Sequence, residues 1–165
     1  MTESIDAPSD TASPELSFRQ AQAADLDAIV CMLADDPLGA QREDYRSPLP
    51  GSYRHAFAAI EADPNNELVL ACLPGAQIAG VLQLTFIPSI TQQGGWRALV
   101  EGVRVHSGCR GQGIGKAMFE WAIQRARVRH CHMLQLTTDK ARPDALRFYQ
   151  SLGFIASHEG MKLRL

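Results

Sequence analysis

Long apolar runs and clustered metal ligands are both missing from this sequence. No stretch of about 18 consecutive apolar residues occurs, so we expect no transmembrane helix. The first residues also lack the basic and then apolar pattern of a secretory signal peptide. The four cysteines lie far apart, without a CxxC pair or a Cys/His spacing typical of zinc: Cys31, Cys72, Cys109 and Cys131. We therefore expect free thiols in a reducing cytoplasm, and no metal.

An excess of charge of one sign is missing as well. The chain has 16 Lys and Arg against 18 Asp and Glu, which gives a net charge of −2 and a pI near 6.2. This balance excludes a partner held by bulk charge, so we expect neither nucleic acid nor a membrane surface as a partner. Hydrophobic residues make up 45% of the 165 residues, which is enough for the core of one domain.

The first residues differ in composition from the rest of the chain. Residues 1–15 include four acids and no bases, and they are rich in small and helix-breaking residues. Such a segment has too few apolar side chains to offset the entropy lost on ordering, so we expect a disordered acidic tail. A plain tail is the simpler interpretation, and an arm that contacts a second copy is the alternative. Residues 16–165 would then form the folded domain.

The pattern of the first half of the domain predicts mostly strands. Strands are expected at 16–19, 67–73, 77–86 and 96–106. Helices are expected at 24–33 and 53–62. Short turns separate the last three of these strands, and strands joined in this way pair antiparallel. This half of the chain therefore predicts an antiparallel meander.

After residue 106 the apolar residues recur with the period of a helix. Five of them follow the i, i+3, i+4, i+7, i+8 spacing that predicts a helix over 113–129: Ile114, Ala117, Met118, Trp121 and Ala122. A strand at 132–137 follows, and a strand–helix–strand unit implies a parallel pair. A last helix is expected from Pro143 to Gly153, with a closing hairpin at 154–156 and 161–165. The expected fold is α+β, with a mixed, mostly antiparallel sheet and about four helices.

Three alternating glycines, Gly111, Gly113 and Gly115, stand between a predicted strand and a predicted helix. A helix N-terminus exposes unpaired N–H groups and the positive end of the helix dipole. Because glycine lets an anion approach these groups closely, the pattern indicates a phosphate site, flanked by Arg110 and Lys116. A tight turn without a ligand is the alternative. The spacing does not match a P-loop, and too few residues follow for a dinucleotide-binding sheet.

Three motifs in the chain resemble those of the GNAT N-acetyltransferases. Residues 110–115, RGQGIG, match the (Q/R)xxGx(G/A) motif of that family, and residues 100–105, VEGVRV, look like the strand before it. Residues 145–154, ALRFYQSLGF, are similar to its A-x-x-(F/L)-Y-x-x-x-G-F signature. The resemblance covers residues 16–165 and implies the GNAT-like acyl-CoA N-acyltransferase fold, in which the parallel strand pair is splayed. The C-terminal part resembles the aminoalkylphosphonate acetyltransferases.

The resemblance implies acetyl-CoA as the cosubstrate. In this family the amides of the glycine loop hold the pyrophosphate, which corresponds here to Arg110, Gly111, Gln112, Gly113, Ile114, Gly115 and Lys116. The pantetheine arm pairs with free backbone groups of the preceding strand, here Val103, Arg104 and Val105. One of these amides would also stabilise the oxyanion of the thioester. Arg142 replaces a pantetheine-binding asparagine, which leaves Lys140 or Arg142 to reach a CoA phosphate or an acidic group of the substrate.

Two residues are candidates for proton transfer. By the resemblance, Tyr149 stands where the family has the general acid that protonates the leaving thiolate. Because Tyr149 lies on the apolar stripe of its helix, a core side chain is the alternative. Glu101 is the candidate base, and simple alternation gives it apolar neighbours that would raise its pKa: Leu99, Val103 and Val105. A substrate-orienting or structural carboxylate is the alternative, and a bulge in this strand would change which way Glu101 faces.

The resemblance implies an acyltransferase that moves an acetyl group from acetyl-CoA to a primary amine by direct attack in a ternary complex. We expect a small-molecule amine, bound by residues 37–53 and by the turn at 91–96. The C-terminal resemblance favours an amine with an anionic group, although the mixed charges of these segments do not select an acceptor. A protein or peptide acetyltransferase is one alternative, and a non-catalytic CoA-binding module is the other. Family-like homodimers are also expected.

Overall fold

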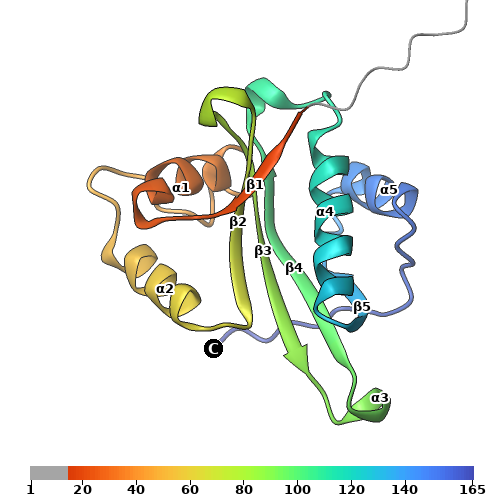
Figure 1. Ribbon diagram of the computed structural model, residues 1–165. Coiled ribbons are helices and arrows are strands. Elements are labelled where there is room, and N and C mark those ends of the chain that lie inside the picture. The colour runs from red at the N-terminus through yellow and green to blue at the C-terminus, as the bar shows by residue number, and fades with distance from the viewer. Residues whose placement is uncertain (1–14) are drawn as a thin grey trace, which may run out of the picture.

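A five-stranded sheet forms the centre of the structure, a computed structural model that describes residues 15–165 (Figure 1). Apart from Glu15, the expected tail lies outside the described residues. The strands lie across the sheet in chain order: β1 (Ser17–Gln20), β2 (Asn66–Cys72), β3 (Ile78–Pro88), β4 (Trp96–Val105) and β5 (Cys131–Leu136). Strands β1 to β4 pair antiparallel, and β5 pairs parallel with β4. The predicted meander and the predicted parallel pair are both confirmed.

Helices cover both faces of this sheet. They are α1 (Leu26–Ala34), α2 (Gly51–Ala62), α3 (Thr91–Gly94), α4 (Ile114–Val128) and α5 (Pro143–Ser151). Figure 1 shows α1 and α2 on one face of the sheet and α4 and α5 on the other, whereas α3 is a short turn at the tip of the β3–β4 hairpin. The predicted α+β class with flanking helices is therefore confirmed.

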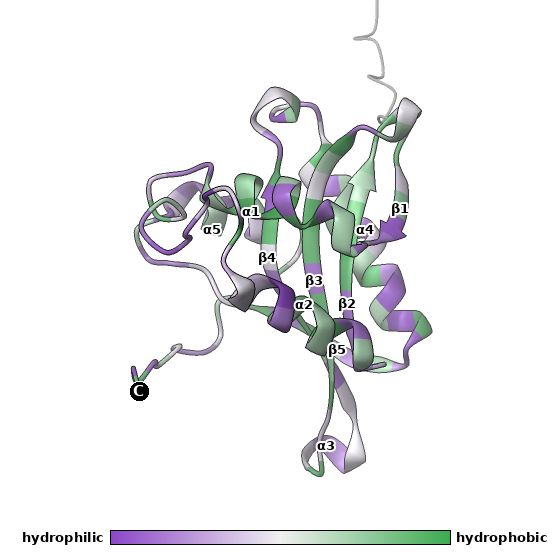
Figure 2. Cartoon of the chain, turned by 90° about the vertical axis from the view of Figure 1, so that its left-hand side faces the viewer, coloured by the Kyte–Doolittle hydropathy of each residue, from purple (hydrophilic) through white to green (hydrophobic). Residues whose placement is uncertain are grey.

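Two apolar clusters hold the helices on the sheet. In α4 the buried residues recur with helical spacing: Ile114, Met118, Phe119, Ala122 and Ala126. They pack against the inner side chains of β2, β3 and β4, and Figure 2 shows apolar colouring concentrated on these strands. A smaller cluster joins Ile29 and Met32 of α1 to Val81 on the opposite face. Since each such side chain contributes about 1.5–3 kcal/mol when fully buried, the clusters fix α1 and α4, whose ends border the site described below.

The parallel strands β4 and β5 diverge at one end. Their ladder runs from Trp96 paired with Cys131 to Val100 paired with Leu136, and it stops there. Strand β4 continues for five more residues, up to Val105, while it remains paired with β3. The backbone of β4 beyond Val100 therefore has a partner strand on one side only. This agrees with the splayed pair that the family resemblance implied.

A β-bulge in β4 changes the direction in which Glu101 faces. Glu101 pairs with Gln83 of β3 and Arg104 pairs with Val81, so β4 has one extra residue between these pairs. Gly102 within the bulge has a φ of +60°, a conformation that favours glycine. The expectation that Glu101 shares a face with Val103 and Val105 is wrong, because the extra residue inverts the alternation.

Packing contacts confirm that the side chains of Glu101 and Val103 face opposite sides of the sheet. Val100, Val103 and Val105 all belong to the apolar cluster on the α4 face. Glu101, the neighbour of Val100, therefore points to the α1 face, and so does Arg104, which lies opposite a residue of the α1 cluster.

The chain after α5 contains no further strand in the described residues. Strands were expected at 154–156 and 161–165, and this expectation is wrong. Phe154 packs against the α4 cluster, but the alternating apolar residues Met161, Leu163 and Leu165 are all exposed. Alternation is compatible with a strand only where a neighbouring strand accepts its hydrogen bonds, and β5 pairs with β4 alone.

Neither a membrane crossing nor a metal cluster is found in the part of the chain that the structure describes. Over residues 15–165, no helix is both long and apolar enough to span a bilayer. In the same residues, no three or more His, Cys, Asp or Glu side chains come together in a way that could hold a metal ion. All four cysteines are free thiols.

Candidate active site

The glycine loop lies between β4 and the N-terminus of α4, where β4 and β5 have diverged. Gly111 and Gly113 have φ values of +76° and +77°, which only glycine adopts readily. At both positions a Cβ atom would meet no other atom within 4 Å, so the backbone is open to a ligand. Gly115 differs, because it lies in the first turn of α4 and a Cβ there would touch Phe148 at 3.5 Å.

The backbone donors of this loop are free over six consecutive residues. No N–H group from Gly111 to Lys116 donates a hydrogen bond to any acceptor within residues 15–165. The first hydrogen bond of α4 runs from the N–H of Ala117 to the carbonyl of Gly113, at 3.1 Å. These donors lie at the positive end of the helix dipole, so the loop presents the environment that a pyrophosphate requires. The residues present therefore fit a CoA-type phosphate.

The side chains around the loop serve local structure. Arg110 donates to the carbonyl of Val105 at 3.2 Å and pairs with the Asp35 carboxylate at 3.0 Å, so it ties the loop to the end of α1. His106 accepts the N–H of Gly108 through Nδ1 at 3.2 Å, as a cap at the end of the strand. Cys109 is 3% exposed and packs in the α4 cluster, which agrees with a structural role rather than a nucleophilic one.

The free edge of β4 faces the gap between β4 and β5. The N–H of His106 donates to the carbonyl of Ala79 in β3 at 2.8 Å. Because backbone groups alternate along a strand, those of Val103 and Val105 point the other way, into the gap. The two carbonyls there accept from guanidinium groups, that of Val103 from Arg104 at 2.8 Å and that of Val105 from Arg110 at 3.2 Å.

Tyr149 lies on α5 and packs against the apolar cluster of α4. Its ring packs edge-on against Phe119 and Phe154, with centroids 5.4 and 6.1 Å away. Its hydroxyl has no hydrogen-bond partner among residues 15–165. Burial raises the pKa of Tyr149 above its usual value of 10, and the nearby charges of Arg142 and Arg104 partly oppose this. The ring thus belongs to the core, while the phenol lies within reach of two positive charges.

Glu101 stands apart from these contacts. It is exposed, on the α1 face of β4, and it forms no ion pair within the described chain. The bulge directly after it separates its direction from that of Val103 and Val105. The turn at 91–96, expected to border the amine pocket, lies at the far end of the β3–β4 hairpin from the glycine loop (Figure 1).

A cluster of charges that sequence reasoning did not assemble lies across the gap. Arg142 donates through Nη2 to both oxygens of Asp36, at 2.8 Å each. The Nε of Arg104 lies 3.3 Å from the same carboxylate, and Arg42 pairs with Asp139 at 2.9 Å. The two adjacent acids that follow the first helix, at 35 and 36, were the available signal, but no local pattern identifies their partners.

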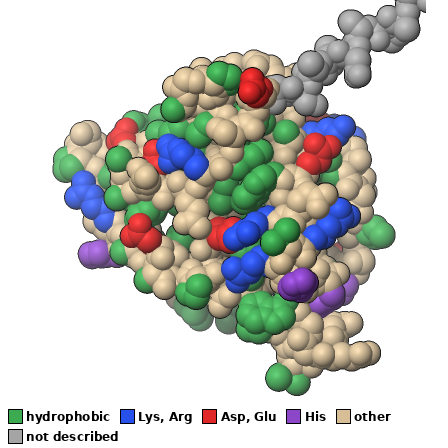
Figure 3. Space-filling view, in the orientation of Figure 1, with side chains coloured by type: hydrophobic (Ala, Val, Ile, Leu, Met, Phe, Trp, Pro, Cys, Tyr) green, Lys and Arg blue, Asp and Glu red, His purple; other side chains and the backbone are tan. Residues whose placement is uncertain are grey.

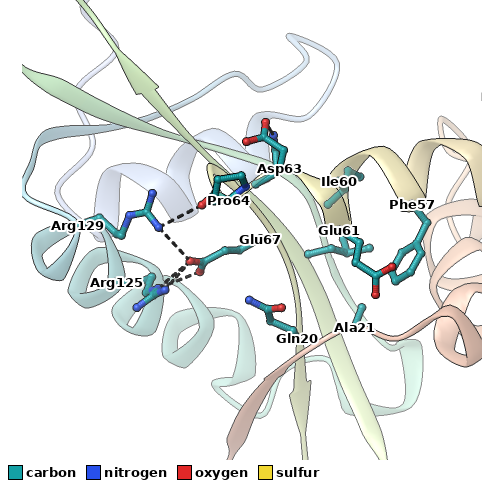
Figure 4. Close-up of a pocket in the computed structure, with 12 residues that line it drawn as sticks. Gln20, Ala21, Phe57, Ile60, Glu61, Asp63, Pro64, Glu67, Arg125 and Arg129 are labelled. Carbon is teal, nitrogen blue, oxygen red and sulfur yellow. Dashed lines mark hydrogen bonds and ion pairs between the residues drawn. The ribbon is translucent and has the colours of Figure 1, made fainter.

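A second set of buried charges lies away from the loop, in a cavity of about 280 Å³ between α2, β2 and α4 (Figure 4). Glu67 is 5% exposed and accepts from Arg125 at 2.5–3.1 Å. Arg129 lies 3.9 Å from the same carboxylate and also donates to the carbonyl of Pro64. Both guanidinium groups are bound to Glu67 or to the chain just before β2, so this set anchors the C-terminal half of α4. On the face in Figure 3, acidic and basic side chains are interspersed, in agreement with the balanced net charge.

Comparisons with known proteins agree with this fold and site. The model of the acetyltransferase (GNAT) family matches residues 34–154. The aminoalkylphosphonate N-acetyltransferase of Salmonella typhimurium is 30% identical over 148 residues, which cover 88% of each chain. The glucosamine 6-phosphate N-acetyltransferase of Trypanosoma brucei brucei is 32% identical over 92 residues, 56% of this chain and 60% of that one.

A solved structure from Bacillus halodurans C-125, described as a transcriptional regulator, is 58% identical. It superposes with a TM-score of 0.88 and covers 92% of this chain and 100% of its own. The family match spans most of the described residues, including the glycine loop and the helix that carries Tyr149. The chain is therefore an acyltransferase that belongs to the acetyltransferase (GNAT) family.

Proposed function

We propose that this enzyme transfers the acetyl group of acetyl-CoA to the primary amine of a small molecule that carries an anionic group. The six consecutive free N–H groups at the start of α4 are the observation that carries the cosubstrate assignment. The anionic group is supported by two relatives whose names contain a phosphonate or a phosphate acceptor. The charged side chains around Arg142 support it from within this chain.

The proposed cosubstrate supplies an acetyl group activated as a thioester. Residues 110–116 would hold its phosphates, since their donors are free and the two positive-φ glycines leave the backbone open. The free edge of β4 at Val103 and Val105 would pair with the pantetheine arm in the manner of an added strand. An N–H of this edge would also donate to the thioester oxygen as negative charge develops there.

The reaction requires proton transfer by two side chains. An alkylamine has a pKa near 10.4, so the acceptor arrives as an ammonium and must lose a proton before attack, a role we assign to Glu101. The amine nitrogen then forms a C–N bond with the acetyl carbon, and the C–S bond breaks. Tyr149 donates its phenolic proton to the leaving sulfur. Its raised pKa keeps that proton in place at neutral pH. The nitrogen loses its second proton to solvent, from which the phenolate left on Tyr149 is reprotonated.

Ion pairs across the cleft favour a small acceptor over a polypeptide. The segment between α1 and α2 is tied to the other wall by Arg110–Asp35, Arg142–Asp36 and Arg42–Asp139. These three bridges hold this segment against the glycine loop and the chain before α5, which favours a compact acceptor over an extended peptide.

A thiol-release assay with acetyl-CoA tests the proposal. The panel should contain small amines with a phosphonate, phosphate or carboxylate group, uncharged alkylamines, and short lysine and N-terminal peptides. We expect release with the anionic small amines, and acetylated product in the mass spectrum. Release with peptides alone would identify a protein acetyltransferase. If no acceptor raises release above background, the protein binds CoA without catalysing transfer.

A further inference from the structure

We propose that Arg104 and Arg142 together form the subsite that binds the anionic group of the acceptor. This inference rests on the proposed function, and it assigns to Arg142 a role on the acceptor side rather than in cofactor binding. The two residues come from β4 and from the start of α5, and they meet at one carboxylate, Asp36, which follows α1. The structure thus builds the cluster from three segments of the chain.

Asp36 holds the two guanidinium groups in a fixed arrangement. Its Oδ1 accepts the backbone N–H groups of Leu38 and Gly39, at 2.9 and 2.7 Å, so the carboxylate is itself anchored. Burial by itself would raise the pKa of Asp36, but the hydrogen bond from Gly39 and the charges of Arg104 and Arg142 lower it below its usual value. A stable carboxylate therefore holds both arginines side by side.

The two arginines keep donors that no group of the described chain uses. Arg142 reaches Asp36 through Nη2 alone, and its Nε and Nη1 donate to nothing within residues 15–165. The Nε of Arg104 is buried and lies 3.3 Å from Asp36, at an angle that gives no hydrogen bond. Two positive charges thus share one negative charge at this point. An anionic ligand would accept from the free Nε and Nη1 of Arg142 beside the charge of Arg104, and guanidinium groups bind such oxygens in pairs.

The position of the pair indicates the acceptor rather than the phosphates of the cosubstrate. Arg104 projects on the α1 face of β4, whereas the free donors of the glycine loop belong to α4 on the opposite face. Arg142 turns toward the same α1 side, to Asp36. Both charges also act on the hydroxyl of Tyr149. An acceptor anchored here by its anionic group would therefore bind on the side of β4 where these charges also act on the proposed acid.

One more carboxylate completes the surroundings of the pair. Glu43 accepts a hydrogen bond from the hydroxyl of Tyr53 at 2.9 Å, and its charge acts on Arg104. The cleft thus offers guanidinium groups and a carboxylate to the same ligand, a combination that suits a zwitterionic amine. It does not suit an acceptor that carries only positive charge.

Matched acceptors separate this subsite from a general effect on catalysis. The acceptors are 2-aminoethylphosphonate, β-alanine and n-propylamine, which present a phosphonate, a carboxylate and no anion beside a primary amine. The variants are Arg142→Gln, Arg104→Gln and Arg142→Lys. Arg147→Gln is the control, because it removes the same charge from the exposed side of α5, where Arg147 pairs with Asp144. Thermal unfolding establishes that each variant is folded.

We expect Arg142→Gln and Arg104→Gln to raise KM for the anionic acceptors by about 10- to 100-fold, the loss typical of a hydrogen bond between charged groups. Any change in kcat that arises through Tyr149 should be equal for charged and uncharged acceptors, because both arginine charges act on its hydroxyl. The KM for n-propylamine and the Kd for acetyl-CoA should stay within about twofold. Arg142→Lys should recover part of the loss, and Arg147→Gln should behave as the wild type. The anionic acceptor with the higher kcat/KM indicates whether the anionic group of the natural acceptor resembles a phosphonate or a carboxylate.

Two outcomes would overturn the subsite without touching the proposed function. One is an equal rise in KM for charged and uncharged acceptors, and the other is weaker acetyl-CoA binding, which would place Arg142 in the cosubstrate wall. Calorimetry of 2-aminoethylphosphonate against the CoA-bound protein gives a readout independent of turnover. If the wild type binds this acceptor no better than Arg142→Gln, the subsite is wrong. If the wild type acetylates no amine at all, the proposed function fails instead.

Discussion

Replacing Tyr149 by phenylalanine separates the two interpretations of this residue, general acid and core side chain. The substitution removes only the hydroxyl, which has no hydrogen-bond partner among residues 15–165. The ring contacts with Phe119 and Phe154 remain. Because no bond is lost and a half-buried polar group is removed, the free energy of unfolding should change by less than about 1 kcal/mol.

The effect on catalysis should be much larger. A positioned acid contributes about 10²- to 10⁴-fold to the rate, so kcat of Tyr149→Phe should fall by about 100-fold or more when chemistry limits turnover. The Kd for acetyl-CoA should stay the same, since binding is assigned to backbone donors. Burial raises the pKa of Tyr149 above 10. The acid is therefore protonated at neutral pH, and its deprotonation should not lower kcat of the wild type there.

The assay is single-turnover acetyl transfer to an active amine, with urea unfolding of the same samples. Ser151→Ala is the control, because it removes a hydroxyl from the exposed side of the same helix, where Ser151 donates to the carbonyl of Phe148 at 2.6 Å. An unchanged single-turnover rate for Tyr149→Phe would refute the acid role and leave Tyr149 as a core residue. A stability loss of several kcal/mol would show instead that the hydroxyl has a structural partner.

Four further substitutions test the glycine loop, the buried ion pair and the anchored carboxylate. Gly113→Ala should lower the free energy of unfolding by about 1–2 kcal/mol and weaken acetyl-CoA binding, because alanine resists a φ of +77°. Gly115→Ala should raise the free energy of unfolding by up to about 1 kcal/mol, since its Cβ would make an ordinary contact at 3.5 Å within a helix. Urea unfolding measures the stability of both glycine variants, and calorimetry measures their binding of acetyl-CoA. Glu67→Gln should lower the free energy of unfolding, measured in urea, by about 1–3 kcal/mol. This loss is smaller than that for a fully buried ion pair, because the Arg125 side chain is 35% exposed. The pKa of Asp36 is lower in the folded protein than in the unfolded chain. Its contribution to the free energy of unfolding is therefore complete above its usual pKa and is lost as the pH falls through its pKa in the folded protein. On acid titration, Asp36→Asn should lose less of its free energy of unfolding than the wild type.

The fold was largely predictable because most elements are specified by local patterns. The period of the apolar residues from Ile114 onward marks α4 within one or two residues of its bounds. Strand–helix–strand order was enough to predict the parallel pair of β4 and β5. The prediction of strands after α5 was wrong because it relied on local pattern alone. Its alternation describes an extended chain, and whether a neighbouring strand pairs with it is decided elsewhere in the structure.

The site was predictable only where it is local in sequence. The glycine loop is one such stretch, and its free donors lie where the motif indicated. The direction of the Glu101 side chain was not predictable, because one extra residue at Gly102 inverts the alternation of β4 and leaves no apolar signal in the sequence. The ion pair of Asp36 with Arg142 joins positions 106 residues apart. Such a pair follows from the packing of α1 and α5 around the sheet.

Unfolding in the presence of ligand tests the central claim, that the glycine loop and the split between β4 and β5 hold acetyl-CoA. At 100 times its Kd, a ligand specific for the folded protein raises the free energy of unfolding by about 2.7 kcal/mol. We predict this increase with acetyl-CoA and no increase with NAD at the same concentration, and a smaller increase for Gly113→Ala. Stabilisation by NAD without stabilisation by acetyl-CoA would contradict the account.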